Sequence, residues 1–303
     1  MEAGMFPEEA PGRGSDGCRP VLVALDCDGT LLRSDGTLGE RTVQVVRELR
    51  RRGVPITLAT GRRVSGALPY AQKLHLDDPL VLHNGAVLAD PKTGESLRYL
   101  PLPVQATAEA IERGRRHDLD MIVFDDPRRR EGAGFIERMP RNPVDRRFVQ
   151  ENIALIQNVP DLIAALPEQP LKAFFAGPPP VVEGFYQEIV AWLAERRAGD
   201  EVRAILYGGP ARETWAVELL NARAGKAEGV AEVAARHGLS LRDVIAFGDD
   251  MNDYDLLATC GFGVAMRNGV MGLQKVARRI APSNDDEGVA VVLAELFGLN
   301  GRG

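Results

Sequence analysis

The chain has 303 residues, a length typical of about two domains, and a net charge of −6. This acidic balance argues against nucleic acid as the main partner, and no stretch approaches the ~20 consecutive apolar residues of a membrane span. The three cysteines form an odd count without the paired spacing of metal ligands, which is typical of a reducing compartment. We therefore expect a cytoplasmic protein, with its oligomeric state left open.

The N-terminal segment differs from the rest of the chain. Residues 1–18 are rich in glycine, proline and glutamate, and they contain no long apolar core of the kind found in signal peptides. This composition predicts a disordered tail, so we expect the ordered domains to begin at residue 19.

Two carboxylates follow the first apolar run of the chain. Residues 21–25 are typical of a central parallel strand, and Asp26 and Asp28 come directly after them. Neighbouring carboxylates at a buried strand end would repel each other unless a cation neutralised them. If the strand persists that far, both side chains point the same way, and Gly29 lets the chain turn away. The alternative is an acidic Asp-Gly turn without a metal.

Three other segments carry polar residues at comparable places. A second apolar run ends in Thr60 and Gly61, a third ends in the acidic cluster with Asp249 and Asp253, and Lys226 opens a helix-like stretch between these two runs. In open parallel sheets, sites form outside the carboxyl ends of the strands, where the strand order reverses. We therefore expect these residues to converge. Their hard oxygen donors favour Mg²⁺ over zinc.

Together the four segments resemble the four motifs of the haloacid dehalogenase superfamily, and the chain is similar to its Cof-like branch of small-molecule phosphatases. The resemblance spans roughly residues 20 to 295 and is weakest from about 100 to 215. Signs of the branch are His83-Asn84-Gly85-Ala86 followed by the segment at residues 90–95, Gly263-Val264-Ala265-Met266 with Asn268, and the run at residues 283–290. The resemblance implies an α/β protein: a Rossmann-like parallel-sheet core with an inserted α/β (α+β) cap domain.

A change of composition suggests where the cap lies. After Ala86 prolines recur, and short apolar runs alternate with helix-like segments. We therefore expect a core domain of residues 19–86 and 222–303, and a cap domain of residues 87–221 that determines substrate specificity.

The first helix of the core is bounded by local signals. Thr37-Leu38-Gly39-Glu40 resembles a capping box, which predicts that the threonine side chain caps the helix start. Val43, Val46 and Leu49 are its apolar positions, and Gly53 predicts its end.

The resemblance implies a role for each catalytic residue. Asp26 is the nucleophile that forms an aspartyl-phosphate, and Asp28 is the general acid and base. Thr60 and Lys226 bind the phosphoryl oxygens, and Lys226 also offsets the repulsion between Asp26 and the phosphate dianion. One departure is that Ala227-Glu228-Gly229 follows the lysine, where the family usually places glycine directly after it.

Metal and substrate ligands are implied in the same way. The expected Mg²⁺ ligands are Asp26, Asp28 through its backbone carbonyl, Asp249, and Asp253 either directly or through water. Asn252 is expected to orient Lys226 or the phosphate. The full set of implied substrate-binding residues is Thr60, Gly61, Arg62, Lys226 and Asn252. Arg62 is expected either near the phosphate or the cap interface, or in a structural salt bridge.

These roles imply a Mg²⁺-dependent phosphoric monoester hydrolase that acts on a small phosphate ester, such as a sugar or cofactor phosphate. Asp28, two residues after the nucleophile, suits ester hydrolysis or phosphomutase chemistry, not dehalogenation. Cys27 is an alternative nucleophile for which no base is indicated. The alternatives for the whole protein are a phosphosugar mutase and a non-catalytic phosphate or metal sensor.

Overall fold

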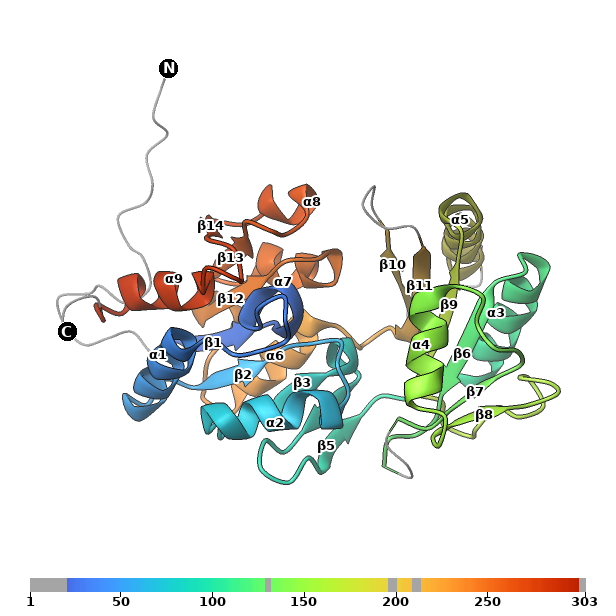
Figure 1. Cartoon of the computed structure of the whole chain (residues 1–303), viewed down its shortest axis with the longest axis horizontal. Coiled ribbons are helices and arrows are strands. Elements are labelled where there is room, and N and C mark those ends of the chain that lie inside the picture. Colours follow the sequence, from blue (N-terminus) through green and yellow to red (C-terminus); the bar gives the residue numbers. More distant parts are fainter. Residues whose placement is uncertain (1–20, 129–131, 196–200, 209–213, 300–303) are drawn as a thin grey trace, which may run out of the picture. The chain divides into compact units, whose positions relative to one another are not determined.

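The structure is a computed structural model, and it describes residues 21–128, 132–195, 201–208 and 214–299. The expected tail of residues 1–18 lies outside the described residues. The chain divides into two compact units, shown in Figure 1: unit 1 is Met1–Leu97 with Lys226–Gly303, and unit 2 is Arg98–Gly225. Within the described ranges, no helix is long and apolar enough to cross a membrane.

Unit 1 is built on a five-stranded parallel sheet with the strand order β14-β13-β12-β1-β2. Its strands are β1 (Leu22–Leu25), β2 (Ile56–Leu58), β12 (Val244–Gly248), β13 (Phe262–Met266) and β14 (Arg279–Ala281). Leu22 pairs with Val244 on one side of β1, and Val23 pairs with Ile56 on the other. The strand order therefore reverses beside β1, which is where sites form in sheets of this kind.

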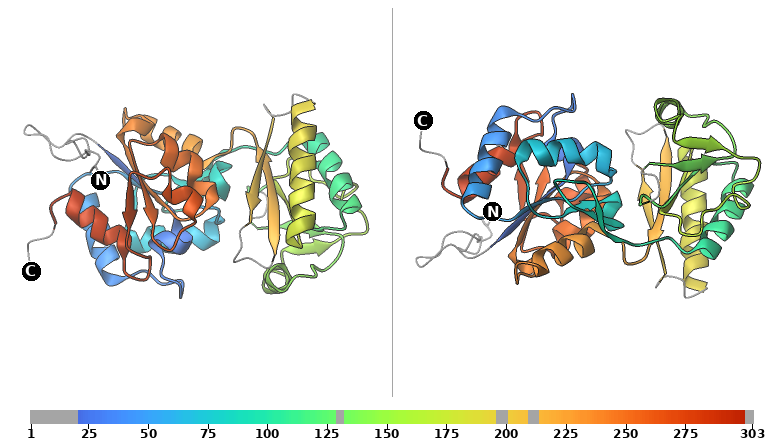
Figure 2. Two further views of the ribbon diagram at one scale, coloured as in Figure 1. Left: turned by 90° about the horizontal axis from the view of Figure 1, so that it is seen from above. Right: turned by 90° about the horizontal axis from the view of Figure 1, so that it is seen from below.

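Helices cover both faces of this sheet, and all four residues of β1 are therefore buried. Residues of α6 and α7 pack against Leu22 and Ala24 on one face. In Figure 2, α1 and α2 lie on the opposite face. The helices of unit 1 are α1 (Glu40–Arg51), α2 (Val64–Leu74), α6 (Lys226–Ala235), α7 (Tyr254–Thr259), α8 (Met271–Gln274) and α9 (Gly288–Leu296).

The boundary between the units differs from the sequence-based one at residue 87. A small three-stranded sheet contains β3 (Leu80–Leu82), β4 (Val87–Ala89) and β5 (Ser96–Tyr99). Since β4 pairs back onto β3, unit 1 extends to Leu97. At the other boundary, unit 2 extends to Gly225, whereas we had placed the return to the core at residue 222.

Unit 2 contains a six-stranded sheet with the order β10-β11-β9-β6-β7-β8. Neighbouring strands are antiparallel except for β7 and β8, which are parallel. The strands are β6 (Asp120–Phe124), β7 (Gly134–Ile136), β8 (Ile156–Asn158), β9 (Lys172–Gly177), β10 (Val202–Tyr207) and β11 (Trp215–Asn221).

Helices also pack on both faces of the second sheet. On one face lie α3 (Val104–Arg116) and α5 (Pro179–Glu195), where the rings of Phe175 and Phe185 are 4.9 Å apart. On the other face, α4 (Pro143–Glu151) packs through Val149 against Ile122. The α/β fold class with a parallel-sheet core and a second α/β unit is thus confirmed.

The start of α1 is capped by a distant residue, so the capping-box prediction was wrong. The Thr37 hydroxyl donates to Asp35 (2.6 Å), and Glu40 is the first residue of the helix. The carboxylate of Glu287 instead accepts from the Thr42 backbone N–H (2.7 Å) and hydroxyl (2.9 Å). This carboxylate lies so close to Gly39 that a Cβ there would be 2.1 Å from it.

Candidate active site

The ends of β1 and β12 bring three carboxylates together. Asp26 follows β1, and its N–H donates to the Phe247 carbonyl of β12 (3.1 Å). Asp249 follows β12, and Asp253 comes one turn later. Oxygen atoms of Asp26, Asp249 and Asp253 all lie within 4.8 Å of one another.

Lys226, the first residue of α6, places its ammonium among these carboxylates. Nζ lies 2.7 Å from Asp26 Oδ1 and 2.6 Å from Asp253 Oδ1. The other oxygen of Asp253 accepts from the backbone N–H groups of Asp249 (3.1 Å) and Asp250 (3.3 Å). Both oxygens of Asp253 are thus engaged, and this residue holds Lys226 in place.

The close approach of α6 depends on Gly229. A Cβ at this position would lie 2.4 Å from Val81 Cγ1 of β3, which is too close for any side chain. Glycine is therefore found three residues after Lys226, where it permits tight packing, and not directly after the lysine as in the family pattern.

Burial dominates the electrostatics of the cluster. It raises the pKa of Asp26 well above its usual range, with Lys226 opposing the shift and Asp253 and Asp249 adding to it. Burial and the charges of Asp253 and Asp250 likewise raise the pKa of Asp249 to about 7. With all four groups ionised, the three carboxylates and one ammonium carry two surplus negative charges, and the raised pKa values reflect the cost of this surplus. A divalent cation would balance this surplus, and the all-oxygen donor set suits a hard ion.

Asp28 lies in a different environment from Asp26. The strand ends at Leu25, and a tight turn (Cys27–Leu31) follows it, so the two side chains do not share one buried face. The side chain of Asp28 is 64% exposed and makes a bidentate ion pair with Arg62 (2.5 and 2.7 Å). This hydrogen bonding to Asp28 raises the pKa of Arg62 above its ordinary value. Arg62 thus makes a salt bridge with Asp28, and its expected role near the phosphate or the cap interface stays a prediction.

Thr60 and Gly61 follow β2 at the same edge of the sheet. Thr60 is buried, its N–H donates to the Val81 carbonyl (2.9 Å), and its hydroxyl accepts from the Arg62 N–H (3.2 Å). A Cβ at Gly61 would lie 3.2 Å from Asn84 Oδ1, so the loop after β2 is in close contact with the turn after β3.

Asn84 is a site residue to which the sequence analysis gave no role. Its side chain is buried, its Oδ1 accepts from Asn252 Nδ2 (3.0 Å), and its N–H donates to the Thr60 carbonyl (3.0 Å). His83 and Asn84 have φ angles of 48° and 52°, which non-glycine residues adopt at an energetic cost. Asn252, expected to orient Lys226 or the phosphate, thus joins the turn after β3 to the loop after β12.

Cys27 is a poor candidate for the nucleophile. It is fully buried, and burial together with the Asp26 charge raises the pKa of its thiol far above neutrality. The thiolate that nucleophilic attack requires is therefore disfavoured.

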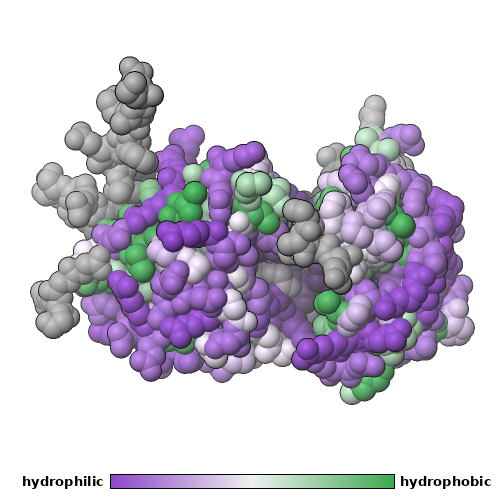
Figure 3. Space-filling view, turned by 45° about the horizontal axis from the view of Figure 1, so that its top comes forward, coloured by the Kyte–Doolittle hydropathy of each residue, from purple (hydrophilic) through white to green (hydrophobic). Residues whose placement is uncertain are grey.

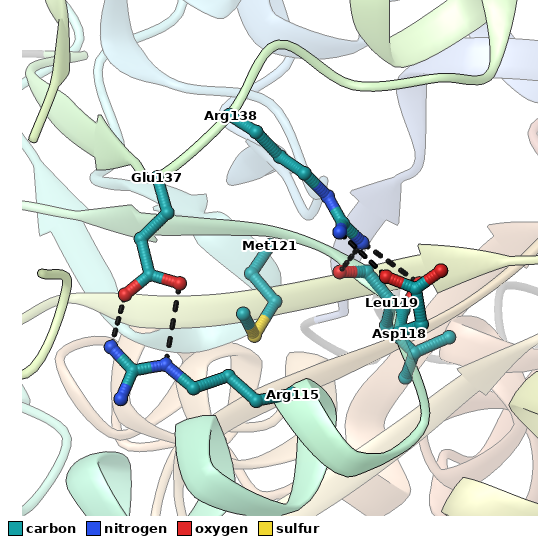
Figure 4. A pocket seen from close by; sticks show the side chains of 6 residues that line it. All are labelled: Arg115, Asp118, Leu119, Met121, Glu137 and Arg138. Carbon is teal, nitrogen blue, oxygen red and sulfur yellow. Dashed lines mark hydrogen bonds and ion pairs between the residues drawn. The ribbon is translucent and has the colours of Figure 1, made fainter. Parts of the chain in front are cut away.

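Unit 2 contains a cavity that also has charged side chains in its lining. The cavity has a volume of about 90 Å³. It is lined by Arg115, Asp118, Leu119, Met121, Glu137 and Arg138 (Figure 4). Arg115 pairs with Glu137, and Arg138 pairs with Asp118. Because its charges are balanced by internal pairs, this cavity has no surplus charge with which to attract a phosphate or a metal.

The surface also has apolar side chains, but they are dispersed. In the face shown in Figure 3, hydrophobic residues form small separate patches among hydrophilic ones. The most exposed large ones are Met271 (76%), Val144 (73%) and Ile153 (61%). Isolated apolar side chains are normal on protein surfaces, so the cluster at the ends of β1 and β12 is the best candidate site.

Comparisons with known proteins agree with this choice. The family model of haloacid dehalogenase-like hydrolases matches residues 23–293. The 5-amino-6-(5-phospho-D-ribitylamino)uracil phosphatase YitU of Bacillus subtilis is 28% identical over 93% of this chain and 99% of its own length. The HMP-PP phosphatase of Serratia proteamaculans is 30% identical over 84% of this chain and 86% of its own length.

A solved structure supports the fold. The structure of a phosphatase of this superfamily from Bacteroides thetaiotaomicron aligns with a TM-score of 0.75, covering 98% of this chain and all of that one, at 21% identity. Since the family model covers most of the chain and the two relatives described above are named as phosphatases, the expected resemblance is confirmed. The chain belongs to the haloacid dehalogenase-like hydrolases, in the Cof-like branch of that superfamily.

Proposed function

We propose that the protein is a Mg²⁺-dependent phosphatase that hydrolyses a small phosphorylated metabolite through an aspartyl-phosphate intermediate. The observation that carries this proposal is the contact of Lys226 Nζ with both Asp26 and Asp253, beside Asp249. Family membership and the activities of the named relatives support the reaction class, which is that of a phosphoric monoester hydrolase.

Asp26 is the nucleophile in this proposal. One of its oxygens attacks the phosphorus atom, the bond from phosphorus to the ester oxygen breaks, and an aspartyl-phosphate forms. Lys226 contacts Asp26 directly, so its positive charge offsets the repulsion between the carboxylate and the phosphate dianion. Thr60, at the end of β2, binds a phosphoryl oxygen through its hydroxyl. Gly61 allows close approach of the backbone.

Asp28 is the general acid and base. In its protonated form this exposed side chain can donate a proton to the leaving oxygen of a bound ester, and the resulting carboxylate can then take a proton from the water that attacks the aspartyl-phosphate. Arg62 donates hydrogen bonds to both oxygens of Asp28 and therefore positions its carboxylate. A direct contact of Arg62 with substrate would compete with that ion pair.

The metal ligands are proposed on charge and donor chemistry. Asp26 and Asp249 would hold Mg²⁺ with the Asp28 carbonyl, while Asp253, whose oxygens are already engaged, would contribute through water. When bound, the ion would neutralise negative charge on the phosphoryl group and on the surrounding carboxylates.

Unit 2 is proposed to be the cap that selects the substrate. Every residue assigned to phosphoryl transfer lies in unit 1, so the leaving group of the ester must be recognised by other residues. The two curated relatives are named for different substrates, a ribitylaminouracil phosphate and HMP-PP, although they share the family. The relatives thus support a small phosphate ester without selecting one.

The proposed function is tested by measuring inorganic phosphate released from a panel of about a hundred phosphorylated metabolites. We expect release from at least one metabolite and from a generic aryl phosphate, with complete loss in EDTA and recovery with added Mg²⁺. A mutase would convert a sugar phosphate without releasing phosphate, and a sensor would bind without turnover. Full activity in EDTA would overturn the metal assignment, and Asp26→Asn serves as the inactive control.

A further inference from the structure

Two motifs singled out in the sequence, Asn268 and the run at residues 283–290, lie beside the turn that carries Asp28. The Nδ2 group of Asn268 donates to the Gly29 carbonyl (2.7 Å). Its Oδ1 accepts from the Asn284 backbone N–H (3.0 Å), and Asn284 Nδ2 donates to the Leu32 carbonyl (2.9 Å). The two asparagines thus hold the turn at Gly29 and at Leu32.

The turn itself is irregular and packed against a carboxylate of the site. Gly29 adopts φ +71°, and a Cβ there would be 2.3 Å from Asp249 Oδ2. Thr30 Oγ1 donates to Asp249 Oδ1 (3.2 Å). A shift of the Gly29 peptide would therefore change the position of Asp28 relative to Asp249.

Asn268 is presented by a rigid segment. The Val270 N–H donates to the Asp249 carbonyl (2.8 Å), and the Arg267 N–H donates to the Ala281 carbonyl (3.0 Å). Gln274 Nε2 lies within 3.1–3.2 Å of three carbonyl oxygens of the same segment. The segment that touches Gly29 is therefore fixed to the backbone of Asp249.

We propose that Asn268 and Asn284 are positioning residues that fix the Cys27–Leu31 turn, and with it Asp28, against the Asp249 loop. This inference rests on the proposed phosphatase function. A general acid must lie within about 2.6–3.2 Å of the atom it protonates, and an error of about 1 Å can cost on the order of 100-fold in rate. Release of the Gly29 carbonyl should therefore impair proton transfer from Asp28 more than it impairs folding.

The variants are chosen to separate positioning from stability. Asn268→Ala removes both hydrogen bonds of the side chain, whereas Asn268→Asp keeps an acceptor for the Asn284 N–H but turns a carboxylate oxygen toward the Gly29 carbonyl. Ser240→Ala is the control, because its exposed hydroxyl makes an analogous bond to Asp243 (2.8 Å) before the start of β12, at the end of the strand away from the site.

The kinetic readout is the leaving-group dependence of kcat/KM. Nitrophenolate leaves with little protonation, whereas phenolate needs more help from the acid. We expect Asn268→Ala and Asn268→Asp to lower kcat/KM at least about 10-fold for phenyl phosphate but only about 2–3-fold for p-nitrophenyl phosphate. Ser240→Ala should lower neither. In an Asp28→Asn background, Asn268→Ala should have less than about a twofold further effect.

A second readout does not depend on activity. The Leu31 and Leu32 N–H groups close the turn on the Asp26 and Cys27 carbonyls, so hydrogen exchange of a peptide covering residues 27–34 reports its order. We expect faster exchange there in both Asn268 variants. Equal losses on the two esters, additive effects with Asp28→Asn, or unchanged exchange would each overturn the inference. If the wild type released no phosphate, the proposed function would fail, and the exchange rates alone would decide whether the asparagines hold the turn.

Discussion

Each unit of the molecule holds an inward-facing lysine, and the two lysines differ in how many carboxylates lie around them. Lys226 of unit 1 contacts Asp26 and Asp253 and has Asp249 nearby, so negative charge exceeds positive charge. Lys172 of unit 2 pairs with Glu218, whose second oxygen accepts from the Tyr207 hydroxyl (3.0 Å).

This difference distinguishes a site from a structural ion pair. A balanced buried pair satisfies its own charges and needs nothing further to be stable. A buried cluster with surplus negative charge is costly until a cation binds, and such an arrangement is retained where it has a function. The comparison therefore supports the proposal that the chemistry takes place in unit 1, on grounds independent of the family match.

The largest effect is expected at Asp26, the proposed nucleophile. Asp26→Asn should lower turnover by on the order of 10⁴-fold or more and abolish acid-stable labelling of the protein by radioactive substrate, because no carboxylate remains to attack. Cys27→Ser, at the adjacent position, is the matched control and should retain activity. If the Asp26→Asn variant were still labelled and still active, there would be no basis for placing the chemistry in unit 1.

A smaller and qualitatively different loss is expected for Asp28→Asn. Asp26 can still attack, but no group protonates the leaving oxygen or activates water, so turnover should fall about 10²–10⁴-fold. With p-nitrophenyl phosphate, rapid-mixing measurements should still show a burst of nitrophenolate. A burst that survived in Asp26→Asn and vanished in Asp28→Asn would reverse the two roles.

Breaking the Lys172–Glu218 ion pair should lower the free energy of unfolding of unit 2. Glu218→Gln leaves the Lys172 ammonium without its counter-charge and should destabilise unit 2 by about 3 kcal/mol. The double variant Lys172→Met/Glu218→Gln should recover much of this loss. Both tryptophans of the chain, Trp192 and Trp215, lie in unit 2, so urea unfolding followed by tryptophan fluorescence reports on this unit. Equal stability of the single and double variants would contradict the prediction.

The smallest effects are expected at two helical glycines, Gly229 of α6 in unit 1 and Gly184 of α5 in unit 2. A Cβ at Gly229 would collide with Val81, so Gly229→Ala should cost about 1–3 kcal/mol and lower kcat by displacing Lys226. Gly184, in α5 of unit 2, has no atom within 4 Å of such a Cβ. Gly184→Ala should therefore stabilise the protein by about 0.5–1 kcal/mol without changing kcat. Urea unfolding followed by circular dichroism measures both changes.

The sheet of unit 1 and the meeting of its strand ends could be predicted from the sequence. Asp26, Thr60 and Asp249 each follow a short apolar run closely, and such runs form buried parallel strands whose ends share one edge. The helix at Lys226 could likewise be placed from its apolar spacing. These features depend on local patterns and on a general rule of topology.

The contacts that shape the site depend on distant pairings, and for these the sequence gives no local signal. Nothing near Asp28 in the sequence indicates that Arg62 pairs with it. The left-handed turn at Asn84 likewise depends on hydrogen bonds to Thr60 and Asn252. Likewise, β4 could be assigned to unit 1 only through its pairing with β3. Proline content, used for the boundary at residue 87, does not report on strand pairing.

The pairing of β1 with β12 has a consequence for synthesis of the protein. Leu22 leaves the ribosome early, but its partner Val244 follows only after the whole of unit 2 has been made. At about 5–20 residues per second, β1 waits on the order of ten seconds or longer for its neighbour. Unit 2, continuous in sequence, can fold during this interval. The inserted unit is thus expected to be native while its host is still incomplete, and Asp26 is expected to acquire its lysine and carboxylate neighbours among the last events of folding.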